Sequence, residues 1–121
     1  MKATAWKRLI MKQCKEVGTM RDAFKPVIDT LSDILEQRDA AYSQFLKEGS
    51  NIIVERVSDR GAVNPVKNPL WLSWQDLNSQ ALKYWDSLGL TPKGLKAISE
   101  DAMKKEQSAF GAALDKILGG G

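Results

Sequence analysis

The strongest constraint on the fold is an amphipathic pattern between residues 27 and 45. Apolar side chains recur there every three or four residues, which places them along one side of an α-helix. This heptad-like seam contains Val27, Leu31, Ile34, Ala41 and Phe45, with Ile28, Leu35 and Tyr42 beside it. The pattern predicts a long central helix that begins or bends near Lys25, because Pro26 follows. Gly49 is expected to stop this helix soon after Lys47.

Arg38 interrupts the seam between Ile34 and Ala41. A long arginine side chain can run over apolar surface and keep its guanidinium in water. A polar residue on such a seam can instead set the register of subunits in an oligomer. The sequence leaves both interpretations open.

A shorter amphipathic helix is expected from Thr4 to about Glu16, with Gly18 as its C-cap. At 100° per residue, one side of this helix is apolar and contains Trp6, Leu9, Ile10, Cys14 and Val17. The opposite side is basic, within an arc of roughly 140°, and contains Lys7, Arg8, Lys12 and Lys15. Thr19 and Asp22 then resemble a capping box for the central helix.

Two further helices are expected in the C-terminal half, joined by a short turn at Gly89. Asn68 before Pro69 and Thr91 before Pro92 are typical of helix starts, and the second helix is expected to end near Lys105. The first of these helices has an apolar stripe of Leu70, Trp74, Leu77, Ala81, Tyr84 and Leu88, with Trp85 alongside. A short amphipathic segment follows, with Phe110, Leu114, Ile117 and Leu118, and the glycines 119–121 should fray.

Residues 51–63 are the one stretch that favours β structure. The segment from Asn51 to Val57 is rich in β-branched residues, residues 58–61 form a turn signal, and Ala62-Val63 could return as a short second strand. A hairpin and an irregular arm both remain open. The fold class predicted from the whole chain is all-α, with one helical domain at 1–107 and an amphipathic tail at 108–121.

The composition disfavours enzymes. The chain has no histidine and a single cysteine, Cys14, so it lacks Ser-His and Cys-His nucleophile pairs and the usual zinc ligand sets. It also lacks a Gly-rich loop of the kind that binds ATP. Asp29, Asp33 and Glu36 share one helical side, but without a fourth ligand a solvated face is favoured over a metal cluster. We therefore expect no catalysis, no metal and no cofactor.

The cellular setting is constrained more weakly. Cys14 cannot form an internal disulfide, which suits a reducing cytoplasm. There is no run of about 18 apolar residues, so no membrane partner is expected.

Charge is distributed unevenly along the chain. Residues 1–25 carry seven basic side chains against two acidic ones, whereas residues 26–50 carry two basic against five acidic. A basic N-terminal end indicates an anionic partner, and the candidate DNA-binding residues are Lys2, Lys7, Arg8, Lys12 and Lys15. An ordinary solvated helix surface is the alternative. Trp71, Trp74 and Trp85 could stack on bases, but packing is favoured for Trp74 and Trp85, and Trp71 stays open.

The stretch from Asn68 to Ile98 resembles the C-terminal half of one family of tailed-phage terminase small subunits. In that family an Asn-Pro opens a helix, and a Leu-Gly-Leu-Thr-Pro element ends it and starts another. Here these elements are Asn68-Pro69 and residues 88–92. The upstream order is also similar, with a long helix holding Arg38-Asp39, a glycine and an extended segment, so that the resemblance covers about residues 20–98. Many family members have Ser and Arg after the Thr-Pro, whereas this chain has residues 93–96 as Lys-Gly-Leu-Lys, so the role of that arginine is not assigned to Lys96.

The resemblance implies a non-catalytic partner of a large terminase subunit. Family members assemble into rings, bind double-stranded phage DNA near the packaging start in the host cytoplasm, and regulate the ATPase and nuclease of the large subunit. For a homo-oligomer we expect the subunit interface to include Val27, Leu31, Ile34, Arg38, Phe45, Trp74 and Trp85. The alternative from another class is a helical protein–protein adaptor or coiled-coil scaffold whose basic end is incidental.

Overall fold

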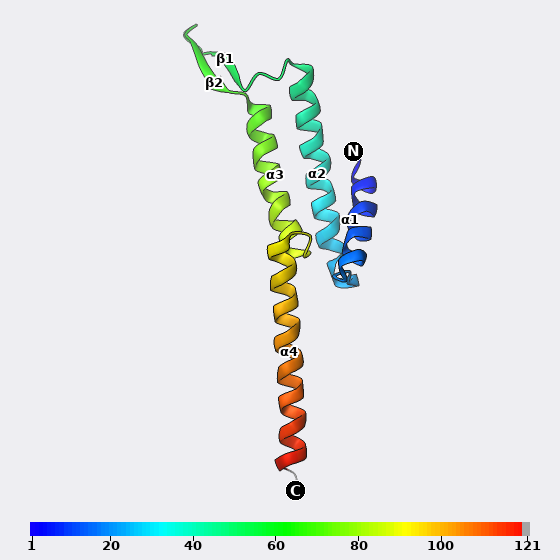
Figure 1. Ribbon diagram of the computed structural model, residues 1–121. Helices are drawn as coiled ribbons and strands as arrows, with labels where there is room; N and C mark the ends of the chain where they lie inside the picture. The colour runs from blue at the N-terminus through cyan, green and yellow to red at the C-terminus, as the bar shows by residue number, and fades with distance from the viewer. Residues whose placement is uncertain (120–121) are drawn as a thin grey trace.

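In the computed structural model, residues 1–119 form four α-helices, one short 3-10 turn and one small hairpin (Figure 1). The structure describes the backbone of residues 1–119 and the side chains of residues 1–100 and 111–118. The elements in chain order are α1 (Ala3–Val17), the 3-10 turn η1 (Asp22–Phe24), α2 (Lys25–Lys47), β1 (Ile53–Val57), β2 (Val63–Lys67), α3 (Pro69–Ser87) and α4 (Pro92–Gly119). The predicted mainly helical fold class is therefore confirmed.

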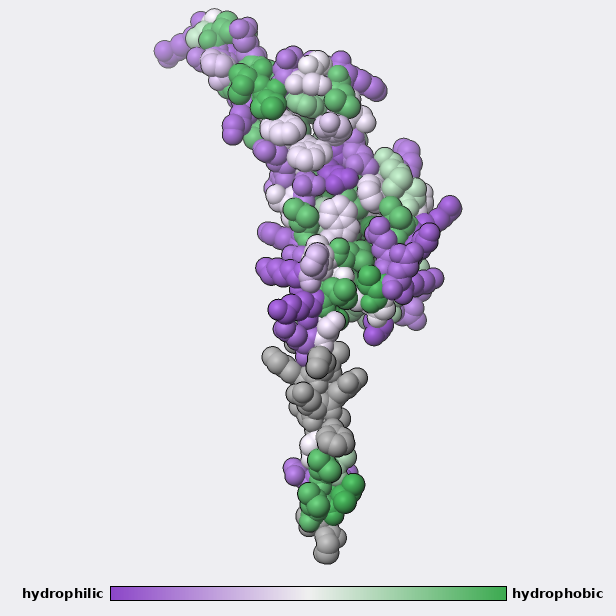
Figure 2. Space-filling view, viewed as in Figure 1, coloured by the Kyte–Doolittle hydropathy of each residue, from purple (hydrophilic) through white to green (hydrophobic). Residues whose placement is uncertain are grey.

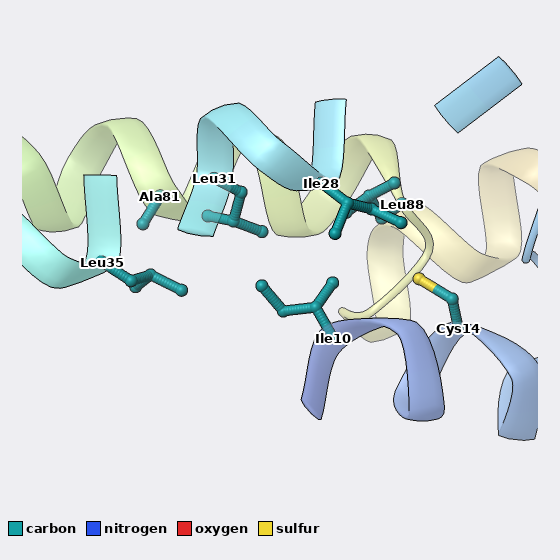
Figure 3. Packing of buried hydrophobic residues seen from close by; sticks show 7 residues of the cluster. All are labelled: Ile10, Cys14, Ile28, Leu31, Leu35, Ala81 and Leu88. Atoms are coloured by element: carbon teal, nitrogen blue, oxygen red, sulfur yellow. The ribbon is translucent and has the colours of Figure 1, made fainter. Parts of the chain in front are cut away.

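The core lies where α1, α2 and α3 meet. The helices α2 and α3 run side by side, and α1 packs on α2 (Figure 1). Figure 3 shows the buried side chains that converge between them, which are Ile10, Cys14, Ile28, Leu31, Leu35, Ala81 and Leu88. The apolar seam of α2 therefore packs against the other helices of its own chain.

The starts and ends of α1 and α2 follow the predicted signals with one exception. Gly18 ends α1 in the left-handed conformation at φ 80°, as expected. Helix α2 begins at Lys25, because Pro26 is tolerated in a first turn, where backbone N–H groups have no helical partner. The predicted capping box is wrong, since the Thr19 hydroxyl donates instead to the carbonyl oxygen of Leu88 and η1 precedes α2.

Residues 53–67 form an antiparallel hairpin, so the hairpin prediction is confirmed and the irregular arm is excluded. The second strand extends to Lys67 and does not stop near Val63, as the sequence suggested. Pro65 explains how this is possible. In an antiparallel hairpin only every second residue pair is hydrogen-bonded, and the bond from the Asn68 N–H to the Ile52 carbonyl oxygen shows which pairs these are. Pro65, opposite Glu55, belongs to one of the other pairs, where no backbone N–H is needed.

The C-terminal helices begin where predicted. The Asn68 side chain accepts a hydrogen bond of 3.0 Å from the Leu70 N–H, and the Thr91 hydroxyl oxygen accepts one of 3.0 Å from the Gly94 N–H. Helix α4 does not end near Lys105 but continues to Gly119. The intervening sequence has no proline, and a single glycine costs a helix only about 1 kcal/mol.

The predicted amphipathic tail is thus the distal end of α4. The side chain of Phe110 and the glycines 120–121 lie outside the described residues. The boundary between a domain at 1–107 and a tail at 108–121 stays a prediction. Within the part of the chain that the structure describes, no helix is both long and apolar enough to cross a bilayer.

Candidate nucleic-acid interface

Helix α1 is held on the acidic side of α2 by a series of polar contacts. The Met1 ammonium lies 3.1 Å from an Asp39 carboxylate oxygen, and the Ala3 N–H donates to Glu36 at 2.7 Å. At the other end the Lys7 Nζ lies 2.7 Å from Asp29. Partners early in α1 contact late positions in α2, so the two helices run antiparallel. Of the three acidic residues that sequence patterning assigned to a solvated face, Asp29 and Glu36 thus contact α1, whereas Asp33 is exposed.

Asp39 is the centre of this contact. Its carboxylate accepts a 2.8 Å hydrogen bond from the Trp6 indole N–H and lies 3.2 Å from the Arg38 guanidinium. Burial alone would raise the pKa of Asp39, but the hydrogen bonds from Trp6, from the Met1 ammonium and from Arg38, with the charge of Arg38, outweigh it. The pKa of this carboxyl is therefore held below its ordinary value.

Arg38 joins three helices inside one protomer. Its guanidinium lies 5.6 Å from the centre of the Trp6 ring and 5.8 Å from that of Trp85, on α1 and α3. It also donates a 3.0 Å hydrogen bond to the Asn78 side chain, and only 16% of the arginine side chain is exposed. Sequence patterning did not indicate this role, because the two tryptophans and Asn78 are distant in the chain.

The five predicted DNA-binding residues divide into two groups. Lys7 pairs closely with Asp29, and Lys2 lies 4.0 Å from Glu36 but keeps 86% of its side chain exposed. The other three, Arg8, Lys12 and Lys15, are exposed, and no salt bridge among the described side chains involves them.

These three residues form what we call the basic face. At 100° per residue they fall within an arc of about 60°, and Arg8 and Lys15 are separated by about 10 Å along the helix axis. The basic face lies away from Ile10 and Cys14, the side of α1 that enters the core. An exposed cationic row of this kind suits the spaced phosphates of a nucleic acid.

The residues predicted to join subunits are used largely within the protomer. Leu31 and Phe45 are buried, and Val27, Ile34 and Trp85 pack against the core. Trp74 stacks on Trp71 with ring centres 5.3 Å apart, in a cluster that joins α2 to α3. The other members of this aromatic cluster are Tyr42 and Phe45. Trp71, left open by the sequence, therefore packs on neighbouring rings. A role for these residues between subunits stays a prediction.

Among the described residues no group of three or more His, Cys, Asp or Glu side chains could hold a metal ion. Cys14 is fully buried, and burial raises the pKa of its thiol. A reactive thiolate is therefore not available at this position.

Comparison with protein families gives a match that spans most of the chain. The model described as phage terminase, small subunit, matches residues 3–105. This chain belongs to the phage terminase small subunit family. The match confirms the resemblance seen at residues 20–98, and it also includes the basic helix α1. This small terminase subunit therefore has a role in phage DNA packaging. Comparisons with curated proteins and with solved structures gave no match.

Proposed function

We propose that this small terminase subunit is a non-catalytic homo-oligomer that binds double-stranded phage DNA through the basic face of α1. In this proposal it regulates the ATPase and nuclease of the large terminase subunit at the start of packaging, in the host cytoplasm. The observation that carries the proposal is the grouping of Arg8, Lys12 and Lys15 on one exposed side of a helix whose other side is fixed to the core.

Assembly would make this small surface effective. Three cations contact few phosphates, so a single subunit binds DNA weakly and releases it as salt rises. A cyclic oligomer repeats the basic face around an axis, and several weak contacts then act together on one duplex. The family match supports this arrangement, and the absence of an ATP-binding loop from the sequence fits a motor in the partner subunit.

The charge pattern of α1 also supports the choice of residues. Lys7 is engaged by Asp29, and Lys2 lies at the contact between α1 and α2. Binding through the basic face would leave these contacts intact. The proposed DNA surface therefore centres on three of the five residues that the sequence selects.

Charge reversal tests the proposal. The variant Arg8→Glu/Lys12→Glu/Lys15→Glu is expected to lose retardation of duplex DNA at about 50 mM salt while keeping its helicity, because it removes the phosphate contacts. The matched control is Lys83→Glu/Lys93→Glu/Lys96→Glu, which changes net charge equally at exposed positions of α3 and α4. The control should retain most of the binding.

The outcomes separate the candidate surfaces. If the control loses binding and the α1 variant keeps it, the DNA surface lies on α3 and α4. If the unmodified protein is monomeric by light scattering and ignores DNA at about 50 mM salt, the adaptor function is favoured instead.

A further inference from the structure

An apolar groove of about 730 Å³ lies where α1 meets the turn between α3 and α4. Its walls come from three helices and the turn, and include Trp6, Val17, Leu82, Trp85, Leu90 and Leu95. Val17 and Leu82 expose 40% and 48% of their surface. A hollow of this size with exposed aliphatic and aromatic walls is typical of a binding site.

The far end of α4 carries an exposed apolar stripe. Leu114, Ile117 and Leu118 follow the three- and four-residue spacing of one helix face. Their exposed fractions are 39%, 73% and 79%. Figure 2 shows hydrophobic residues gathered at this end of the molecule. Such a stripe is stabilised when it packs on another apolar surface.

The stripe cannot reach the groove of its own chain. Helix α4 begins at the groove, where Pro92 and Leu95 form part of the wall, and continues unbroken to Gly119. At 1.5 Å per residue, Leu114 lies about 29 Å along the axis from Leu95. Figure 1 shows α4 leading away from the other helices. A partner for either surface must therefore come from another molecule.

We propose that the groove binds residues 111–118 of a second copy of this chain. The inference rests on the homo-oligomer of the proposed function and specifies its contact. Every copy carries one groove and one stripe, so the contact is head-to-tail and repeats from copy to copy. Such a contact produces a ring when the rotation between neighbours closes.

The size of the contact favours a ring of identical chains. An eight-residue helical segment with three aliphatic side chains covers much less than the roughly 800 Å² per partner that a stable pair of proteins buries. An isolated pair joined in this way would separate readily. In a closed ring each subunit makes two such contacts, and opening one of them leaves the subunits joined by the others. The small contact therefore fits repeated self-assembly better than a single contact with an unrelated protein.

Cysteine cross-linking in the full-length protein tests this contact. Leu82→Cys protein is mixed with Ile117→Cys protein under a mild oxidant, and a covalent dimer between the two variants is expected. The matched control replaces Leu82→Cys with Leu72→Cys, on the same helix and similarly exposed at 44%, but outside the groove. The native Cys14 is fully buried and is common to all variants. Efficient cross-linking of position 117 to 82, and little to 72, supports the proposal.

Other outcomes overturn it. If Ile117→Cys cross-links equally well to Leu72→Cys and to Leu82→Cys, the stripe does not bind in the groove. The same conclusion follows if the main product is a dimer of Ile117→Cys with itself. Protection of Leu82→Cys from a thiol reagent only when the large terminase subunit is added assigns the groove to that partner. If the unmodified protein is oligomeric and binds DNA but the Leu82→Cys and Ile117→Cys variants give no cross-linked product, this inference fails while the proposed function stands. A monomer indifferent to DNA contradicts both.

Discussion

The Thr19 hydroxyl donates a 2.7 Å hydrogen bond to the carbonyl oxygen of Leu88, which lies 69 residues later in the chain. Both residues are buried, and the methyl group of Thr19 lies beside Gly89, where an added Cβ would approach it to 2.9 Å. The turn after α1 is thus fixed to the turn between α3 and α4. This contact links the helix that carries the basic face to the start of α4.

Replacing Thr19 with valine should destabilise the protein without changing its shape. Thr19→Val removes the donor to Leu88 but keeps the volume, and a buried carbonyl left without a partner costs about 1–3 kcal/mol. Urea unfolding followed by circular dichroism measures this loss. The control Thr30→Val removes an exposed bond to the Pro26 carbonyl and should change stability by less than about 0.5 kcal/mol. Equal losses in the two variants would show that the Thr19 bond has no special role.

Replacing Arg38 with methionine should loosen the contact between α1 and α3. The change removes a charged hydrogen bond to Asn78 and the interactions with Trp6 and Trp85, and we expect a loss of about 2–3 kcal/mol. Arg38→Lys should be intermediate, because a lysine keeps the charge but loses the planar stacking. Tryptophan fluorescence during denaturation reports the loss. Arg8→Met, at an exposed position, is the control, and a similar loss there would contradict the assignment.

Sequence signals that depend on neighbouring residues predicted most of the fold, but they could not predict contacts between residues that are distant in the chain. The caps at Asn68 and Thr91 and the end of α1 at Gly18 depend on residues a few positions apart, and all three are confirmed. The capping box at Thr19 failed, because a buried bond to a distant carbonyl took the hydroxyl.

The candidate site shows the same division. Helical periodicity selected the basic side of α1 but could not separate Lys7 from Arg8, Lys12 and Lys15, because Asp29 comes from another helix. The central seam was predicted as an apolar face, but a period alone does not say whether the partner is the same chain or a second copy. Leu31 is fully buried within its own protomer.

Replacing Gly94 with alanine should destabilise the junction of α3 and α4, although alanine is the better helix former. A Cβ at this position would lie 2.1 Å from the Asp86 carbonyl oxygen, so α4 would have to move. We expect a net loss of about 2 kcal/mol, as for overpacking in a core. Gly111→Ala is the matched control on the same helix, because nothing lies within 4 Å of the added carbon. That variant should show slightly more helix by circular dichroism, because alanine favours a helix over glycine by about 1 kcal/mol. Unchanged stability in Gly94→Ala would show that the two helices are not held at this close approach.

The contribution of Asp39 to stability should disappear in acid. Since its pKa in the folded protein lies below that of the unfolded chain, the folded state binds fewer protons and stability rises with pH. The stabilisation is complete above the unfolded pKa of about 3.9 and is lost as the pH falls through the folded pKa. Asp39→Asn keeps the shape of the side chain but cannot carry the charge that attracts Arg38 and the Met1 ammonium.

The measurement compares urea unfolding of the unmodified protein and Asp39→Asn from pH 7 to pH 3. We expect the variant to be less stable by a constant amount near neutrality, and the two stabilities to converge below about pH 4. Asp33→Asn is the control, because Asp33 is exposed on the same helix and no salt bridge among the described side chains involves it. A gap that widens as the pH falls would mean that burial, which raises the pKa of Asp39, outweighs its hydrogen bonds. In that case the carboxylate would not be what holds α1 against α2.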